Sequence, residues 1–196
     1  MKFCSQCAHP VEFDIPPDDH LPRHICPHCG TIHYQNPKLV VCSIPVWEAD
    51  GEVKILLCKR AIEPRYGWWT LPGGFMENNE STVDAAQRET IEEAGARIEV
   101  VHRLFSLINL PRMHQVQLFY RARLLDLDFK PGMESLEVKL FSEAEIPWNE
   151  IAFSTVRHAL QCFFADLAQV KRGGSFGFHS HDILEPHYSM DKADHA

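Results

Sequence analysis

The sequence predicts an α/β fold in which helices flank a mixed β-sheet, preceded by a small cysteine-rich module. Three observations lead to this prediction. Alternating apolar segments typical of strands recur between residues 39 and 141. Two segments with an apolar period near 3.6 residues, 82–94 and 154–170, are typical of amphipathic helices. Four of the seven cysteines lie in a stretch rich in proline and aspartate at the start of the chain.

The cysteine-rich module, residues 1–35, contains two Cys-x-x-Cys pairs: Cys4 with Cys7, and Cys26 with Cys29. Each pair can place two thiolates on one tetrahedral ion, so the spacing is typical of a zinc ribbon. Bound zinc would supply the folding free energy that so small a core lacks. Four cysteine ligands leave no open coordination position, which favours a structural role. Two disulfides or a redox pair are the alternatives. The neighbouring histidines are expected to be surplus, namely His9, His24, His28 and His33.

Charge and cysteine usage indicate the environment of the protein. No apolar segment typical of a signal peptide follows Met1, and no long apolar run occurs elsewhere. The other cysteines are scattered in apolar contexts, namely Cys42, Cys58 and Cys162. We therefore expect a cytoplasmic protein without a membrane segment. The net charge of −8, with only Lys2 and Arg23 as Lys or Arg in the module, argues against a nucleic-acid partner.

The main domain is expected over residues 36–172. Strands at 39–47 and 53–59 flank Asp50-Gly51, a hairpin turn signal. Leu71-Pro72-Gly73-Gly74 is expected to end a strand in a tight loop, where two glycines let the backbone approach a phosphate or a metal. Residues 98–110 are expected to contain β-type segments, and later strands are expected at 115–124 and 137–141. Residues 173–196 are rich in Gly, Ser, His and Asp, and a flexible tail is expected there.

The acidic segment 82–94 is expected to form a helix with defined ends. Ser81 suits the N-cap, Asp84 lies in a capping-box position, and Gly95 stands where the helix should stop. One face is expected to carry the apolar set Val83, Ala86, Thr90, Ile91 and Ala94. The opposite face would carry Glu89, Glu92 and Glu93. A solvated acidic face is one interpretation of these carboxylates. The other is a site for Mg²⁺ or Mn²⁺, which take oxygen ligands.

The residues around this helix favour the metal site, because their spacing resembles the signature box of the Nudix hydrolases. The matching positions are Gly74, Glu80, Arg88, Glu89, Glu92, Glu93 and Gly95. Thr90 departs from the pattern, since the box usually has a bulky aliphatic residue there. Nudix enzymes cut nucleoside diphosphates linked to another group. The resemblance therefore implies an α/β/α sandwich and metal-dependent attack of water on a pyrophosphate.

The same resemblance implies a role for individual residues. The metal ligands would be Glu89, Glu92, Glu93 and the carbonyl of Gly74. Arg88 would orient the carboxylates by ion pairing, and Glu92 would share in catalysis. Related enzymes often take the last ligand or the general base from a glutamate outside the box. We expect Glu137, in preference to Glu134, in that position.

The substrate is expected to be ADP-ribose or FAD, cleaved to AMP and a phosphate ester. On the stretches Tyr34-Gln35-Asn36-Pro37, Leu57-Cys58-Lys59-Arg60 and Glu134-Ser135-Leu136-Glu137, the chain up to about residue 170 resembles plant chloroplast Nudix enzymes that cleave these compounds. Pro111 falls where ADP-ribose-type enzymes carry a proline. A zinc ribbon ahead of such a domain also resembles the NADH pyrophosphatase group, but the proline-rich motif of that group is absent from residues 107–115. The alternatives are an NADH pyrophosphatase or NAD-cap-removing enzyme, a non-catalytic ADP-ribose sensor, and an RNA-directed enzyme.

Contacts to the substrate can be assigned only as candidates. For the diphosphate they are Arg60, Arg112 and Arg121, with Pro111 beside them in the chain. For stacking on adenine or flavin they are Tyr34, Trp68, Trp69 and Phe75. The resemblance also implies a homodimer, to which Phe3, Phe13 and Ile25 could contribute apolar contacts.

Overall fold

The computed structural model describes residues 1–184 of the 196-residue chain. Two compact units follow one another, Met1–Pro37 and Lys38–Ala196. The first unit is built on a three-stranded antiparallel sheet, which consists of β1 (Glu12–Asp14), β2 (Arg23–Ile25) and β3 (Ile32–His33). The boundary after Pro37 lies close to the predicted end of the cysteine-rich module.

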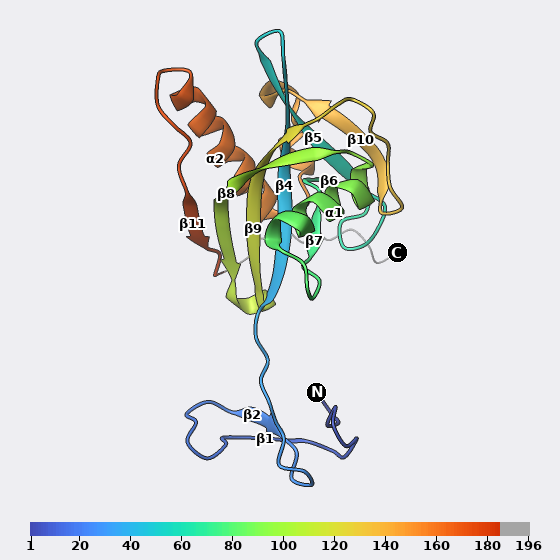
Figure 1. Cartoon of the computed structure of the whole chain (residues 1–196), viewed down its shortest axis with the longest axis vertical. Coiled ribbons are helices and arrows are strands. Elements are labelled where there is room, and N and C mark those ends of the chain that lie inside the picture. Colours follow the sequence, from blue (N-terminus) through green and yellow to red (C-terminus); the bar gives the residue numbers. More distant parts are fainter. Residues whose placement is uncertain (185–196) are drawn as a thin grey trace, which may run out of the picture. The chain divides into compact units, whose positions relative to one another are not determined.

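A mixed sheet of eight strands forms the centre of the second unit (Figure 1). Its main path runs β10-β5-β4-β9-β8-β11, while β6 pairs with β5 and β7 pairs with β4. The pairs β4–β9 and β8–β11 are parallel, and the remaining pairs are antiparallel. In chain order the strands are β4 (Lys38–Ala49), β5 (Glu52–Arg60), β6 (Trp69–Thr70), β7 (Gly73–Phe75), β8 (Ile98–Leu110), β9 (Gln115–Leu124), β10 (Ser135–Phe141) and β11 (His179–Asp182).

The helices α1 (Thr82–Ala94) and α2 (Ser154–Val170) cover opposite faces of this sheet. Successive side chains of a strand point to opposite faces, so Val41 packs in the core beneath α1 and Cys42 in the core beneath α2. The predicted α/β/α sandwich is confirmed. Three short 3₁₀ turns join these elements: η1 (Pro111–Met113), η2 (Glu143–Glu145) and η3 (Trp148–Glu150). Within the described residues, no helix has the length and apolar character needed to cross a bilayer.

Local signals determine both ends of α1 as predicted. The Ser81 side chain accepts a hydrogen bond from the backbone N–H of Asp84, and the Asp84 carboxylate accepts one from the backbone N–H of Ser81, which completes a capping box. Gly95 ends the helix in the left-handed conformation, at φ 59°, and its N–H bonds to the carbonyl of Ile91.

Three features differ from the predictions. Gly73–Phe75 forms the short strand β7 instead of a tight loop, because its backbone pairs with β4. Ile91 is 53% exposed, so it does not belong to the apolar face of α1. Within the predicted tail, His179–Asp182 forms β11, which pairs with the edge of β8. His187 and His195, also part of that predicted tail, lie outside the described residues.

Candidate active site

A cavity of about 1000 Å³ opens in the second unit between the acidic helix α1, strand β7 and the start of α2. Its polar lining is dominated by glutamates, namely Glu63, Glu77, Glu89, Glu92, Glu93 and Glu134. Its apolar lining includes Val40, Ile62, Phe75, Leu110, Met113, Met133 and Phe153. The cavity therefore combines a dense acidic wall with apolar surface, as a site for an organic ligand with a charged group requires.

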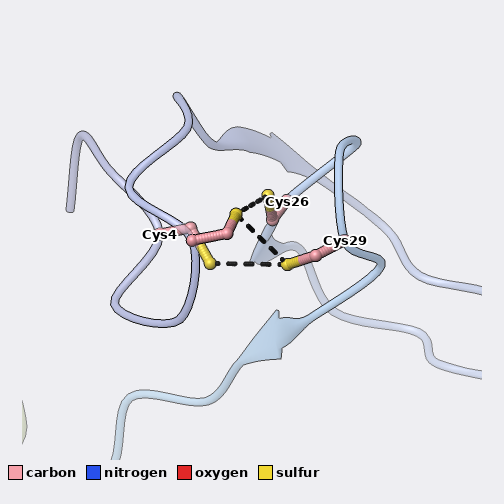
Figure 2. A group of neighbouring side chains, drawn as sticks. Cys4, Cys26 and Cys29 are labelled. Carbon is pink, nitrogen blue, oxygen red and sulfur yellow. Dashed lines mark hydrogen bonds between the residues drawn. The ribbon is translucent and has the colours of Figure 1, made fainter.

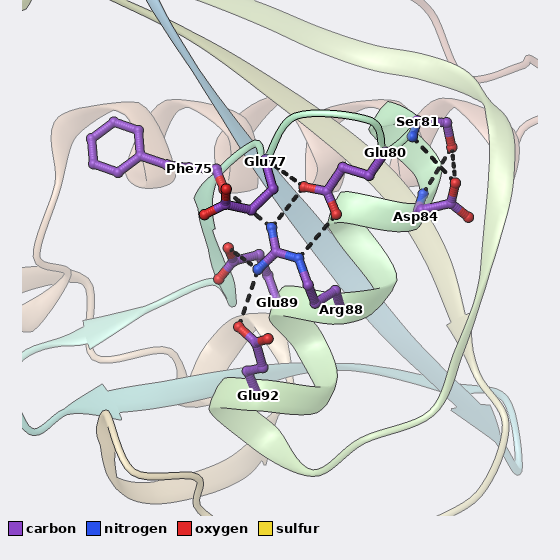
Figure 3. Close-up of polar contacts among 8 residues, drawn as sticks. All are labelled: Phe75, Glu77, Glu80, Ser81, Asp84, Arg88, Glu89 and Glu92. Carbon is purple, nitrogen blue, oxygen red and sulfur yellow. Dashed lines mark hydrogen bonds and ion pairs between the residues drawn. The ribbon is translucent and has the colours of Figure 1, made fainter.

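Arg88 organises the acidic wall (Figure 3). Its Nη1 donates to Glu89 Oε1 at 2.7 Å and to Glu92 Oε2 at 3.1 Å. Its Nε and Nη2 donate to Glu80, at 3.0 and 2.8 Å, and Nη2 also donates to the carbonyl of Phe75 at 3.1 Å. The hydrogen bonds from Arg88 lower the pKa of Glu80 to about 2. The expected positioning role of Arg88 agrees with this geometry.

Two of the three glutamates on α1 are buried, which the sequence pattern did not indicate. Glu89 is 8% exposed and Glu93 7%, and both lie on the buried side of α1 beside Ala85 and Ala86. Burial raises the pKa of Glu93 to about 8, although the N–H of Gly73 donates to its Oε2 at 3.3 Å. Burial also raises the pKa of Glu89, against the hydrogen bond from Arg88. In both groups the effect of burial outweighs the nearby positive charge, which is Arg88 beside Glu89 and Arg60 near Glu93.

A divalent cation fits this donor set chemically, since hard cations take carboxylate and carbonyl oxygens. Its charge would favour ionised Glu89 and Glu93, whose pKa values burial has raised. Glu89 and Glu92 each bond to Arg88 through one carboxylate oxygen, Oε1 of Glu89 and Oε2 of Glu92. Among the described residues, only groups built on the ribbon cysteines bring three or more ligand atoms within 4.8 Å of one another.

Glu134 joins the acidic wall from a loop that is tied to the end of α1. The N–H of Lys130 donates to the carbonyl of Ala94 and the N–H of Gly132 to that of Glu93, both at 2.9 Å. These bonds satisfy carbonyls that have no partner within the helix. They hold the loop so that Glu134 lines the cavity and raises the pKa values of Glu89 and Glu93 by charge repulsion.

Glu137, the predicted base, is exposed on β10 and is not among the described residues that line the cavity. An irregularity in the β5–β10 register between Ser135 and Glu137 separates the two stretches of this strand. The structure brings Glu134 to the site and does not bring Glu137 there. The sequence pattern offers both glutamates as candidates, and Glu137 is the one preferred from the sequence.

Of the residues predicted to contact the substrate, some line the cavity and others do not. Arg60 lines the cavity, with its guanidinium carbon 5.0 Å from the centroid of the Phe153 ring. Pro111 and Arg112 lie in η1 and are not among the described lining residues, although Met113 of the same turn is. Arg121 lies over the ring of Phe176, away from this cavity.

Phe75 is the stacking candidate that lines the cavity. Val40 of β4 is paired with Phe75 of β7 on one side and with Gln117 of β9 on the other. These three side chains therefore share one face of the sheet, and sequence reasoning missed Gln117. Of the other stacking candidates, Trp69 is buried against Phe141 and Trp68 is not among the described lining residues. Tyr34 belongs to the first unit.

The four ribbon cysteines come together in the first unit (Figure 2). Cys7 Sγ lies 3.4 Å from both Cys26 Sγ and Cys29 Sγ, and Cys4 Sγ lies 3.7 Å from Cys29 Sγ. These separations are too long for disulfide bonds, which measure about 2.05 Å. They are close to the spacing of about 3.8 Å between thiolates that share a tetrahedral zinc. His33 lies outside this group, with its Nε2 3.3 Å from Cys4 Sγ.

Comparisons with known proteins agree with both parts of the chain. A family model described as the NUDIX domain matches residues 37–160. The chain belongs to the Nudix family. A second model, described as Nudix N-terminal and named for its zinc ribbon, matches residues 2–35. The predicted fold class and the resemblance are therefore confirmed.

Individual relatives cover different shares of this Nudix chain. A NUDIX hydrolase structure from Nitrosomonas europaea is 54% identical with a TM-score of 0.86, and covers 94% of this chain and 100% of its own. The NAD-capped RNA hydrolase NudC of Chromobacterium violaceum is 29% identical over 69% of this chain and 48% of its own length. The ADP-ribose pyrophosphatase of Methanocaldococcus jannaschii is 29% identical over 58% of this chain and 67% of its own. The chain thus spans about half the length of the first of these curated relatives.

Proposed function

We propose that this protein is a divalent-metal-dependent pyrophosphohydrolase that cleaves ADP-ribose or FAD, giving AMP and the other phosphate ester. The observation that carries the proposal is the pair of buried glutamates, Glu89 and Glu93, in the wall of a cavity of about 1000 Å³. Burying two carboxylates costs free energy unless a cation or a hydrogen-bond network compensates for it. Their position in the Nudix box, together with Arg88, supports a divalent metal as that cation.

Four glutamates of the acidic wall have a role in this proposal, together with Gly74 and Arg88. Glu89, Glu92, Glu93 and the carbonyl of Gly74 would hold the metal. When bound, the metal neutralises phosphate oxygens and lowers the pKa of an attacking water. Arg88 keeps Glu89 and Glu92 on one side of the cavity. Glu134 lines the same cavity and is the better candidate than Glu137 for accepting the proton of that water.

ADP-ribose is the preferred substrate of the two. A relative with 29% identity is named ADP-ribose pyrophosphatase. The apolar wall around Phe75, Leu110 and Met113 offers contact area for a nucleoside, and Gln117 offers amide groups for hydrogen bonds. Arg60 would contact the diphosphate from within the cavity.

A second candidate is the cleavage of NADH or of an NAD cap. The relative named NAD-capped RNA hydrolase NudC favours it, since it matches 69% of this chain. The missing proline-rich motif at residues 107–115 argues against it. A third reading, an ADP-ribose sensor without activity, is disfavoured because all the box carboxylates are present.

A substrate panel tests these alternatives. Purified protein is incubated with ADP-ribose, FAD, NADH and ADP-glucose, each with Mg²⁺ or Mn²⁺, and AMP release is measured by chromatography. We expect ADP-ribose or FAD to give the highest kcat/KM, and Glu93→Gln to abolish turnover. Exclusive turnover of NADH would replace the leading substrate with the second candidate. Tight binding of ADP-ribose without any product would favour the sensor.

We further propose a cytoplasmic homodimer with one structural zinc ion per chain. Phe3 and Phe13 support a contact surface on the ribbon, because they are 60% and 64% exposed. Sedimentation equilibrium of the full chain tests the dimer. A monomer mass at micromolar concentration would contradict it.

A further inference from the structure

The helix α2 begins in the wall of the cavity without a side-chain cap. Phe153 occupies the N-cap position and its side chain makes no capping hydrogen bond. Ser154, Thr155 and Val156 follow as the first turn, and all three line the cavity. The N–H groups of a first turn have no acceptor within their own helix. Among the described residues, no acceptor is found for these three N–H groups.

Thr155 adds an independent observation at the same place. Thr155 is only 2% exposed, and its Oγ1 has no hydrogen-bond partner within the described part of the chain. A buried hydroxyl without a partner is destabilising, so natural proteins rarely keep one unless something satisfies it. Thr155 lines the cavity, so its unpartnered hydroxyl lies beside the space that a ligand would occupy.

Two features at this end of the cavity favour an anion. The N-terminus of an α-helix carries roughly half a positive elementary charge, which favours anions. The guanidinium of Arg60, also in the cavity wall, lies 5.0 Å from the centroid of the ring of Phe153, the N-cap residue. The glutamates of α1 contribute the opposite sign to the same cavity. The cavity therefore offers carboxylates for cations and a helix start for an anion.

We propose that the first turn of α2, with the Thr155 hydroxyl and Arg60, is an anion subsite that takes a phosphate group of the substrate. The identity of the ligand rests on the proposed function, whereas the existence of the subsite does not. Inorganic phosphate, ribose 5-phosphate and AMP share the chemistry that the subsite recognises. The relative affinities of the two sugar phosphates would assign the subsite to one half of the substrate.

Binding is measured by titration calorimetry of the full chain with zinc retained, in buffer without Mg²⁺ or Mn²⁺, so that no metal at the glutamates binds the phosphate. The probe is inorganic phosphate, followed by AMP and ribose 5-phosphate. Thr155→Val keeps the shape of the side chain and removes the hydroxyl. We expect it to weaken phosphate binding about tenfold or more, as loss of a hydrogen bond to a charged group does. Thr155→Ser keeps the hydroxyl and should bind within about twofold of the unmodified protein.

Two controls isolate the hydroxyl and the backbone. Ser106 is another fully buried residue whose Oγ has no partner among the described residues, but it does not line the cavity, so Ser106→Ala should leave phosphate binding unchanged. Ser154→Pro removes the first N–H of the helix at a position where proline is tolerated, while Ser154→Ala keeps it. Phe153 already has an extended backbone, at φ −129° and ψ 138°, which a following proline accepts. We expect Ser154→Pro to bind phosphate more weakly than Ser154→Ala.

Equal phosphate affinity of the unmodified protein and Thr155→Val would overturn the proposal. So would a lower melting temperature of Thr155→Val without loss of binding, because the hydroxyl would then have a structural partner. The substrate panel and the phosphate-binding test can fail independently of each other. Absence of turnover with retained, Thr155-dependent phosphate binding would remove the proposed function and leave the subsite. Turnover of the substrate together with unchanged phosphate binding in Thr155→Val would remove the subsite and leave the proposed function.

Discussion

The backbone of Gly74 lies directly against the carboxylate of Glu89. A Cβ atom at position 74 would come within 2.5 Å of Glu89 Oε2 and 2.6 Å of its Cδ. A Cβ atom at the preceding Gly73 would come within 2.5 Å of the Sγ of buried Cys42 and within 2.7 Å of two backbone atoms, Cys42 Cα and the carbonyl oxygen of Val41. Two adjacent glycines therefore have different tasks: Gly73 allows β7 to pair with β4, and Gly74 leaves room for the carboxylate.

Alanine substitutions separate these tasks. Gly74→Ala should displace the flexible carboxylate of Glu89 and lower kcat/KM about 10²-fold, since small displacements in an active site cost that much. Its melting temperature should remain close to that of the unmodified protein. Gly73→Ala should lower the free energy of unfolding by about 1–3 kcal/mol through overpacking against backbone. Kinetics and thermal denaturation of both variants check this, and equal effects on stability would contradict the distinction.

The role of Glu134 is tested against Glu137. Glu134→Gln keeps the size of the side chain and removes its basicity, so kcat should fall by about 10²–10⁴-fold. Glu137 is exposed on β10, and Glu137→Gln should leave kcat within about twofold of the unmodified value. Steady-state kinetics with ADP-ribose at saturating Mg²⁺ distinguish the two. A large loss in Glu137→Gln with normal activity in Glu134→Gln would reinstate the sequence-based choice.

The raised pKa of Glu93 predicts how stability depends on pH. Burial raises this pKa from 4.5 to about 8 in the folded protein. Between these values the folded protein holds a proton that the unfolded chain has released, so the free energy of unfolding falls as pH rises. The slope from this group should approach about 1.4 kcal/mol per pH unit within the window. Urea denaturation from pH 5.5 to 8.5, in buffer free of Mg²⁺ and Mn²⁺ but with zinc retained, measures it.

Glu93→Gln provides the control for this pH dependence, because it has no proton to release. Its slope over the same window should be flatter than that of the unmodified protein. Added Mg²⁺ should stabilise the unmodified protein more at pH 8.5 than at pH 5.5, since binding then displaces less proton. An unchanged slope in Glu93→Gln would mean that other groups cause the dependence.

Removal of one ribbon cysteine tests the zinc site. Cys26 is fully buried in the cysteine cluster, and Cys26→Ser should lower the zinc content from one ion per chain to nearly none. The first unit should then unfold, because metal binding supplies its folding free energy, while the second unit keeps its own unfolding transition. Cys162→Ser removes a cysteine outside the cluster and should keep the zinc. Elemental analysis and calorimetry report both quantities, and zinc retained in Cys26→Ser would contradict the assignment.

Local sequence signals predict the elements that they themselves determine. Ser81, Asp84 and Gly95 fix the bounds of α1 to the residue, because each acts on backbone groups within one turn. The strand at 115–124 and the helix at 154–170 also have the predicted bounds, and the single strand β8 spans the region 98–110 in which β-type segments are expected. The four cysteines were predicted to come together because their spacing alone is typical of one metal site.

Features that depend on distant partners were not predictable in this way. The buried face of α1 includes Glu89 and Glu93, whereas a hydrophobic pattern assigns carboxylates to the solvent side and Ile91 to the core. Glu134 enters the cavity because its loop bonds to the carbonyl end of α1, a contact between segments far apart in sequence. The polar strand β11 has no apolar pattern and forms by pairing with the edge of β8. The unpaired Thr155 hydroxyl gives no sequence signal at all.

The measurement that tests the central claim most directly is AMP release from ADP-ribose, with and without Mg²⁺, by the unmodified protein and by Glu93→Gln. If the buried glutamates hold a catalytic metal, AMP and ribose 5-phosphate should form in equal amounts only with the divalent ion. The rate for Glu93→Gln should then be at least about 10²-fold lower. AMP release that persists without any divalent ion, or an unchanged rate in Glu93→Gln, would contradict the account.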